Sequence, residues 1–131
     1  MAPPRIATSE GMLAWDRWLQ SQTNPSEQSA VSRADLATAV RYTLQVIAEK
    51  VPGASVEVRV APFGATQVIE GSNHRRGTPP AVIEMAPQTW LRIASGLQTW
   101  HEAMMSALID ASGEHADLSP HLPLRVSGPG S

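Results

Sequence analysis

The chain has 131 residues, of which 42% are hydrophobic and 17% are charged, and its formal net charge is −2. This length suits one domain with a sizeable core, and the charge gives no general attraction to nucleic acid or to an anionic membrane. The sequence contains no cysteine, which excludes thiolate catalysis, disulfide bonds and thiolate metal sites.

The N-terminal region predicts a short amphipathic helix after a proline-rich start. Residues 1–8 are rich in proline, and Ser9 stands at the position of an N-cap. The apolar residues that follow fall on one helical stripe: Met12, Leu13, Trp15, Trp18 and Leu19. No apolar run is long enough for a secretory signal or a membrane span, so we expect a cytoplasmic protein without stable membrane insertion.

A longer helix is expected next. The stretch SRAD at Ser32–Asp35 resembles a capping box, and apolar residues then repeat at helical intervals until Pro52-Gly53 ends the helix. The period changes after this point, because residues 56–60 (VEVRV) alternate between valine and a charged residue. Such alternation predicts a strand with one solvated face.

Two more strands are predicted at residues 65–70 and 81–85, on either side of the loop GSNHRRGTPP. Short strands joined by turns favour an antiparallel meander. A helix is then expected from Pro87, which suits a first helical position, to Ala94. Gly96 would close this helix in the left-handed conformation.

A further short helix is predicted at Trp100, because TWHE at Thr99–Glu102 is a capping box. Alternation over residues 107–111 predicts the last strand, which Gly113 would stop. One helical turn near residues 116–119 and a frayed tail would complete the chain.

The sequence carries no recognisable catalytic or metal-binding motif. The histidines at positions 74, 101, 115 and 121 lack both the HExxH spacing and a cysteine partner, so no metal site or cofactor is expected. There is no Gly-x-Ser-x-Gly elbow, and no nucleophile, base and orienting group can be named together. We therefore expect that the protein is not an enzyme.

A basic turn is the weaker of two candidate sites. His74, Arg75 and Arg76 lie among small residues whose backbone N–H groups would form a nest for a phosphate or carboxylate head group. The alternative is a solvated hairpin tip. Nucleic-acid binding is not expected, because aromatic residues are few and no second basic stripe accompanies the turn.

The other candidate site is a set of bulky apolar residues from the two short helices: Trp90, Leu91, Trp100, Met104 and Met105. Such residues at helical spacing are most often part of a core. Methionine also adapts to varied apolar guests, and binding sites are concave and mostly apolar. Spacing alone leaves both interpretations open, a packed core and a cavity beneath a helical lid.

A series of short motifs extends over residues 56–124. They are VEVRV followed by PF, H-RGTPP before a strand ending in Glu84, Trp-Leu-x-x-Ala-x-Gly at 90–96, Trp-x-x-Ala at 100–103, and ASG with ADLS and LPL from Ala111. In these motifs, and more faintly in the helix from Ser32, the chain resembles the small bacterial sterol-carrier-protein-like domains. It also resembles the C-terminal part of mycothiol-dependent maleylpyruvate isomerase-like proteins, without their metal-binding helical bundle.

The resemblance implies a sheet of about five strands covered by helices, with an apolar tunnel that carries sterols, fatty acids or acyl-CoA without catalysis. Three departures from the family pattern have consequences. Ala86 replaces a usual capping Asp, and Ala107 replaces a usual glycine, so we expect the corner at Ala107 to avoid positive φ. Leu108 and Asp110 occupy positions that are often basic, which favours an uncharged guest.

The sequence thus predicts an α/β fold of the α+β type, with a mainly antiparallel, five-stranded twisted sheet covered by helices. One domain is expected over residues 1–131, with an N-terminal helix and linker (1–28), a core (29–124) and a flexible tail (125–131). The predicted function is non-enzymatic binding of a lipid-like apolar small molecule between sheet and helices. The alternative hypothesis is a homodimerisation or partner-protein module anchored by Trp15 and Trp18.

Overall fold

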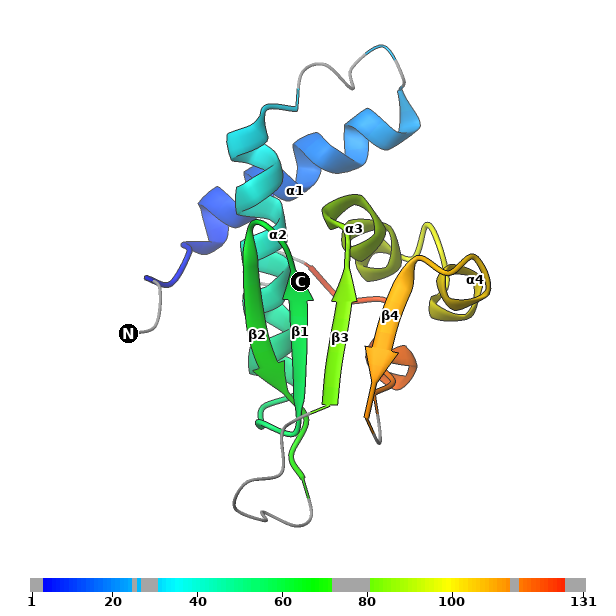
Figure 1. Ribbon diagram of the computed structural model, residues 1–131. Coiled ribbons are helices and arrows are strands. Elements are labelled where there is room, and N and C mark those ends of the chain that lie inside the picture. Colours follow the sequence, from blue (N-terminus) through cyan, green and yellow to red (C-terminus); the bar gives the residue numbers. More distant parts are fainter. Residues whose placement is uncertain (1–3, 25, 27–30, 72–80, 114–115, 127–131) are drawn as a thin grey trace.

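The computed structural model describes residues 4–24, 26, 31–71, 81–113 and 116–126, and these residues form four α-helices, four strands and one 3₁₀ turn. In chain order the elements are α1 (Thr8–Thr23), α2 (Arg33–Lys50), β1 (Val56–Val60), β2 (Gly64–Val68), β3 (Ala81–Met85), α3 (Pro87–Ser95), α4 (Trp100–Met105), β4 (Ile109–Ser112) and the 3₁₀ turn η2 (Ser119–His121). Figure 1 shows the sheet in front of α2 and α3, with α4 beside β4 and α1 crossing α2.

The four strands of the described residues form one mixed sheet in the order β2-β1-β3-β4. β1 pairs with β2 antiparallel and with β3 parallel, and β3 pairs with β4 antiparallel. The prediction of a five-stranded, mainly antiparallel sheet is therefore wrong in strand number and in the pairing of β1 with β3. The prediction of mixed helical and strand structure is confirmed.

The sheet order follows from how much of each strand is buried. β1 contributes three fully buried valines and lies inside the sheet, whereas the only fully buried side chain of β2 is that of Val68 and β2 lies at the edge. A meander would have placed β3 beside β2. Instead the Ala81 N–H bonds to the Ser55 carbonyl, and β3 runs alongside β1.

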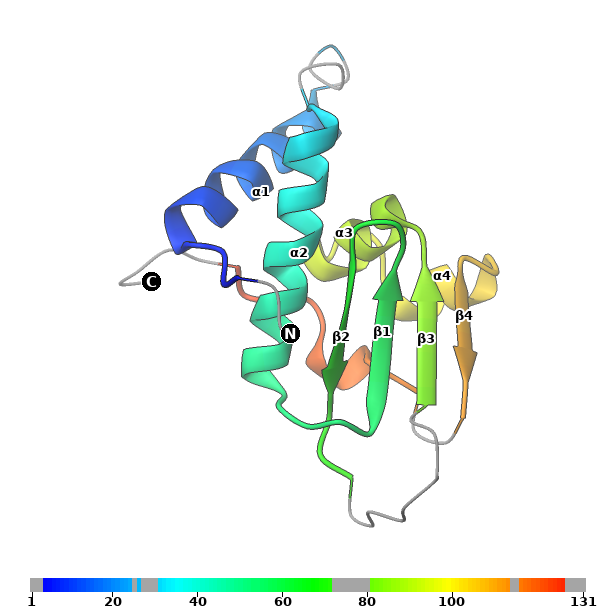
Figure 2. The ribbon, with the colours of Figure 1, turned by 60° about the vertical axis from the view of Figure 1, so that its left-hand side comes forward.

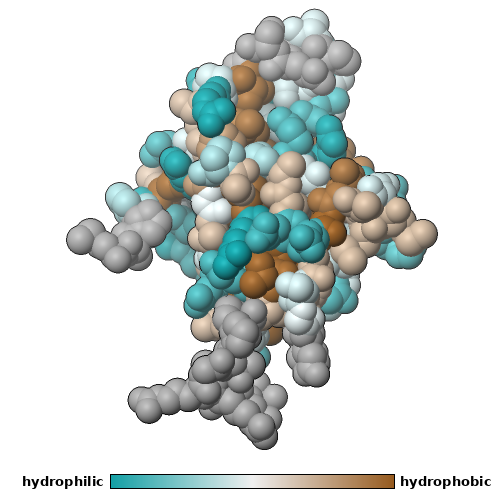
Figure 3. Space-filling model, in the orientation of Figure 1, coloured by the Kyte–Doolittle hydropathy of each residue, from teal (hydrophilic) through white to brown (hydrophobic). Residues whose placement is uncertain are grey.

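Helices cover only one face of the sheet, as Figure 2 shows. Val56, Val58 and Val60 point towards the helices and are fully buried, while the alternate residues Glu57 and Arg59 lie on the other face. Figure 3 shows a group of hydrophilic residues near the centre of this open face, with hydrophobic residues beside it. The alternation predicted for residues 56–60 is confirmed, including its solvated side.

Helix ends agree with the predicted caps in part. α2 begins after Ser32, whose hydroxyl accepts a hydrogen bond from the Asp35 N–H, and α4 begins with the complete capping box of Thr99 and Glu102. α1 is an exception, because its N-cap is Ala7, which lacks a capping side chain, and Ser9 lies inside the helix. The first helix is also longer than expected, at 16 residues.

Backbone conformation corrects one further expectation. Gly96 closes α3 with φ 85°, as predicted, but Ala107 at the corner between α4 and β4 adopts φ 58°. The corner keeps the left-handed conformation despite the Cβ of alanine. Ala86 caps α3 without a side-chain hydrogen bond, in agreement with the missing Asp. Towards the C-terminal end, the predicted turn near 116–119 is found at Ser119–His121.

The tryptophans of α1 belong to the chain's own core. Trp15 is 4% exposed and Trp18 is 1% exposed, and their rings stack with centroids 5.8 Å apart. The indole N–H of Trp18 donates to the Gln88 side chain of α3 at 3.0 Å. These side chains are therefore not free to anchor a partner, and the predicted interaction module loses the residues on which it rested.

Candidate ligand groove

Two of the five predicted cavity residues are core residues. Trp90 and Leu91 in α3 are both 0% exposed. The indole Nε1–H of Trp90 donates to the Thr43 hydroxyl of α2 at 2.7 Å, and that hydroxyl also lies 2.8 Å from the Ala39 carbonyl. The position of Trp90 is thus set by α2 on one side and by the sheet on the other.

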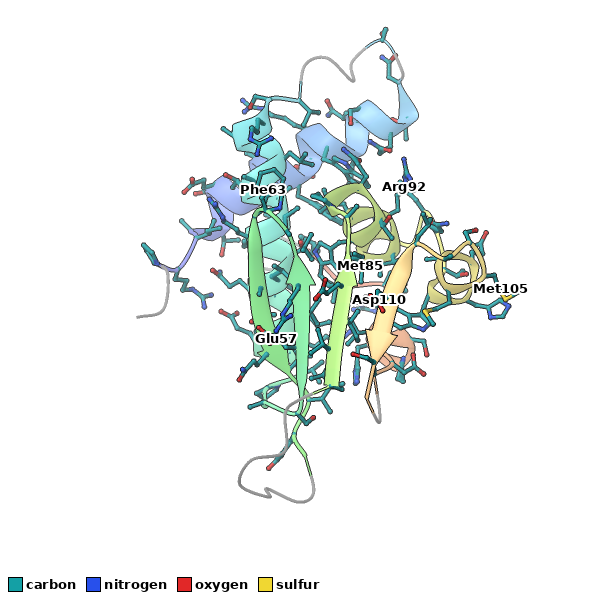
Figure 4. All side chains as sticks on the ribbon, in the orientation of Figure 1. Glu57, Phe63, Met85, Arg92, Met105 and Asp110 are labelled. Carbon is teal, nitrogen blue, oxygen red and sulfur yellow. The ribbon has the colours of Figure 1, made fainter. Side chains whose placement is uncertain are left out.

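The remaining three lie at or near the surface of α4. Trp100 is half-buried, whereas Met104 is 41% exposed and Met105 is 74% exposed. Figure 4 shows Met105 on the outer side of α4, away from the sheet. The helix is only six residues long and buries Ala103 alone, so both methionines face outwards. The five residues thus differ widely in exposure, and their predicted role as a cavity lining stays a prediction.

The basic turn of His74, Arg75 and Arg76 lies outside the described residues. Its predicted role in binding an anionic head group therefore stays a prediction.

The described residues form a groove with a volume of about 950 Å³ at the β2 edge of the sheet. We call it the α2–β2 groove. It opens to solvent between the segment before α1, the outer side of α2 and the free edge of β2. Its lining residues are Pro4, Arg5, Ile6, Glu10, Thr38, Arg41, Leu44, Gln45, Ala48, Glu49, Phe63, Gly64, Ala65 and Thr66.

Helical geometry explains why α2 supplies the floor of this groove. The lining residues from Thr38 to Glu49 recur at intervals of three and four, so they share the side of α2 that is turned away from α3. Gly64 brings β2 close to this side, since a Cβ at Gly64 would lie 3.4 Å from the Leu44 side chain. The groove therefore forms where the outer side of α2 lies against the edge strand β2.

Apolar and charged groups alternate around the groove. Ile6, Leu44 and Phe63 supply apolar surface, while the Nε–H of Arg41 donates to the Phe63 carbonyl at 2.8 Å. Among the described residues, the two Nη groups of Arg41 have no hydrogen-bond partner. Arg5 and Glu49 form an ion pair with each other, so, as far as the described residues go, Arg41 and Glu10 are the lining charges left for a guest.

The open face of the sheet carries matched charges. Arg59 donates to Glu57 and Glu84, each at 3.1 Å. The hydrogen bond to Glu57, followed by that to Glu84, raises the pKa of Arg59. All three side chains are solvent-accessible, so this network is screened by water and keeps the uncovered face soluble. Figure 4 places Glu57 and Asp110 on this same face.

Among the described residues, no three His, Cys, Asp or Glu side chains come together as metal ligands would. No helix in the described part of the chain is long and apolar enough to cross a membrane.

Sequence reasoning did not identify the α2–β2 groove. Leu44 is one of the apolar residues that repeat at helical intervals in the second helix, a pattern that predicts a core position, and residues 1–8 show only a proline-rich composition. The one sequence feature that pointed to the groove was a second face of α2, on which polar and apolar residues such as Gln45 and Ala48 are mixed. That signal does not show which distant segments complete the walls.

Comparison with known families gives one result. Residues 32–124 match the profile of the family described as bacterial SCP ortholog, where SCP denotes sterol carrier protein. The match includes the α2 and β2 walls of the groove but not the segment before α1. A search of curated proteins found no match. Because the family match covers well over half of the chain, the protein belongs to the bacterial sterol-carrier-protein-like family.

Proposed function

We propose that the protein binds a lipid-like, largely apolar small molecule in the α2–β2 groove and that it catalyses no reaction. The groove's volume of about 950 Å³ is the observation that carries the proposal. It falls within the range of roughly 300–1,000 Å³ that is usual for small-molecule sites. Membership of the sterol-carrier-protein-like family supports a lipid-like ligand class.

The energetics of an apolar chain are sufficient for binding. Each CH₂ group removed from water contributes about 0.8 kcal/mol, so a chain of about ten carbons offers roughly 8 kcal/mol before the costs of association. Ile6, Leu44 and Ala48 supply apolar surface for such a chain. The Nη groups of Arg41, which have no hydrogen-bond partner in the described part of the chain, would orient a polar end at the mouth.

The proposed site differs from the cavity expected beneath the two short helices. Trp90 and Leu91 are fully buried core residues, and Met105 faces solvent. The α2–β2 groove still lies between a helix and the sheet, but at the opposite edge. Its position makes the two candidate sites experimentally separable.

Native mass spectrometry of freshly purified protein, followed by solvent extraction, tests the proposal. We expect a co-purifying apolar mass, or a thermal shift with oleate, oleoyl-CoA or cholesterol. Ala48→Trp should fill the groove and abolish binding, while Met105→Trp on α4 should leave it intact. The reverse pattern would place the ligand at α4, and an empty protein that responds to none of the three probes would contradict the function itself.

A further inference from the structure

We propose that Pro4–Ile6 forms a strap that closes one side of the α2–β2 groove and opens while α1 stays in place. Pro4, Arg5 and Ile6 all line the groove. The strap lies outside the family-matched residues 32–124. The inference concerns how a guest enters, and its functional consequence rests on the proposed ligand binding.

Two residues of α2 fasten the strap. The Ile6 N–H donates to Gln45 Oε1 at 2.9 Å, and Gln45 Nε2 donates to the Ile6 carbonyl at 3.0 Å. Gln45 thus satisfies both backbone groups of one extended residue, as a neighbouring strand would. Glu49, one helical turn further along α2, forms the ion pair with Arg5. The fastenings are polar and converge on a single side of α2.

These fastenings differ from the contacts that hold α1. The Arg5 and Glu49 side chains are 67% and 49% exposed, so their attraction is weak and is screened by salt. α1 instead buries Trp15 and Trp18 in the core. The two hydrogen bonds between Gln45 and Ile6 are part-buried. A segment held by exposed and part-buried polar contacts opens more readily than one held by buried apolar contacts.

The boundary between the two regions lies at Ala7. This residue is the N-cap of α1, has extended backbone angles and contributes no side-chain capping bond. The first helical hydrogen bond, from the Gly11 N–H to the Ala7 carbonyl, does not involve the strap. Rotation about the backbone before Ala7 would therefore release Ile6 without breaking the helix.

Opening would change the groove in two ways. It would remove the side of the groove that Pro4–Ile6 forms. It would also free the Gln45 amide and the Glu49 carboxylate on α2, which forms the floor of the groove. A guest could then enter from the side of α2 and be covered when the strap closes again. Salt should speed entry, because it weakens the pair of Arg5 with Glu49.

Hydrogen exchange measured by NMR tests strap opening without any ligand. We expect the Ile6 amide to exchange at least tenfold faster than the Trp15 amide in α1. Gln45→Leu removes both side-chain hydrogen bonds to Ile6 and should accelerate Ile6 exchange by roughly tenfold more, with Trp15 unaffected. Gln20→Leu, an exposed change on α1, is the matched control. If the Ile6 and Trp15 amides exchanged at the same rate, the proposal that the strap opens independently of α1 would be wrong.

A covalent lock tests the functional consequence. The chain has no cysteine, so Arg5→Cys combined with Glu49→Cys introduces a unique pair that a short bis-maleimide can bridge. Stopped-flow uptake of Nile red, an uncharged apolar dye, would be compared with and without the bridge. We expect the bridge to slow uptake at least tenfold and the unbridged variant to take up dye faster than the wild type. Asp16→Asn serves as a control for charge loss.

The outcomes separate the two proposals. Equal uptake by the bridged and unbridged forms would overturn the strap while leaving ligand binding standing. Failure of every form to bind the dye, together with no response to the lipid probes, would overturn the proposed function. Ile6 exchange would still decide whether the strap opens.

Discussion

The indole Nε1–H of Trp90 in α3 donates a 2.7 Å hydrogen bond to the hydroxyl of Thr43 in α2, and both side chains are fully buried. This bond joins the helix that supplies the groove floor to the helix that covers the centre of the sheet. It also explains how a polar hydroxyl and an indole N–H are accommodated in an otherwise apolar layer.

Thr43→Val should test the worth of this hydrogen bond. Valine keeps the shape of threonine but leaves the Trp90 N–H buried without a partner, so we expect a loss of about 1–3 kcal/mol in the free energy of unfolding. Thr43→Ser, which keeps the hydroxyl, should lose less. Urea unfolding measures both losses. Equal losses for valine and serine would show that the hydrogen bond stabilises the fold no more than the methyl group that serine lacks.

Gly11→Ala should destabilise the packing of α1 on α2. A Cβ at Gly11 would lie 2.2 Å from the ring of Tyr42, so the two helices must move apart. We expect the free energy of unfolding to fall, because the overpacking cost of about 1–3 kcal/mol exceeds the gain of up to about 1 kcal/mol from alanine's helix preference.

A smaller residue at position 42 is the natural rescue of that variant. Gly11→Ala should cost less stability in a Tyr42→Ala background than in the wild type, as thermal melts would show, because the obstructing side-chain atoms are gone. Gly64→Ala is the contrast, since its Cβ would meet the nearest side chain at an ordinary 3.4 Å. An equally large loss at both glycines would argue against a specific clash with Tyr42.

Ala107→Gly should raise stability or leave it unchanged, unlike most alanine-to-glycine changes. Ala107 adopts φ 58°, where an L side chain costs about 1–2 kcal/mol. Glycine removes this cost but adds about 0.4–1 kcal/mol of unfolded-state entropy. Ala34→Gly, at an exposed position in α2, should lose about 0.5–1 kcal/mol. Parallel losses in both variants would contradict the strained corner.

The capping box of α4 should make stability depend on pH. The hydrogen bond from the Thr99 backbone N–H, and next that with the Thr99 side chain, lowers the pKa of Glu102 below its ordinary value of 4.5. Because the folded pKa is the lower one, this contribution is present above pH 4.5 and is lost as the pH falls from 4.5 through the folded pKa.

Glu102→Gln provides the measurement. The variant should have a flatter melting temperature against pH than the wild type over that acidic window, and NMR titration of the Glu102 carboxyl should give a lowered pKa. Identical profiles for both proteins would show that the capping carboxylate does not contribute. Glu10→Gln, at an exposed position in the first turn of α1, controls for the general effect of removing one acid.

Local patterns in the sequence determined most of the secondary structure. The alternation of valine with charged residues in residues 56–60 identified β1 and its solvent-exposed face. The capping residues Ser32 and Thr99 identified the starts of two helices. These features depend on neighbours within about four positions, which a single sequence displays directly. The family was recognisable from its motifs for the same reason.

Only the tertiary structure decided the sheet order, the direction of the methionines and the place of the groove. The parallel pairing of β1 with β3 depends on competition among strands distant in sequence, and Met105 faces solvent because α4 is too short to bury it. The groove joins residues near positions 5, 45 and 65. Periodicity determines which side of an element is apolar, whereas long-range packing determines what that side meets.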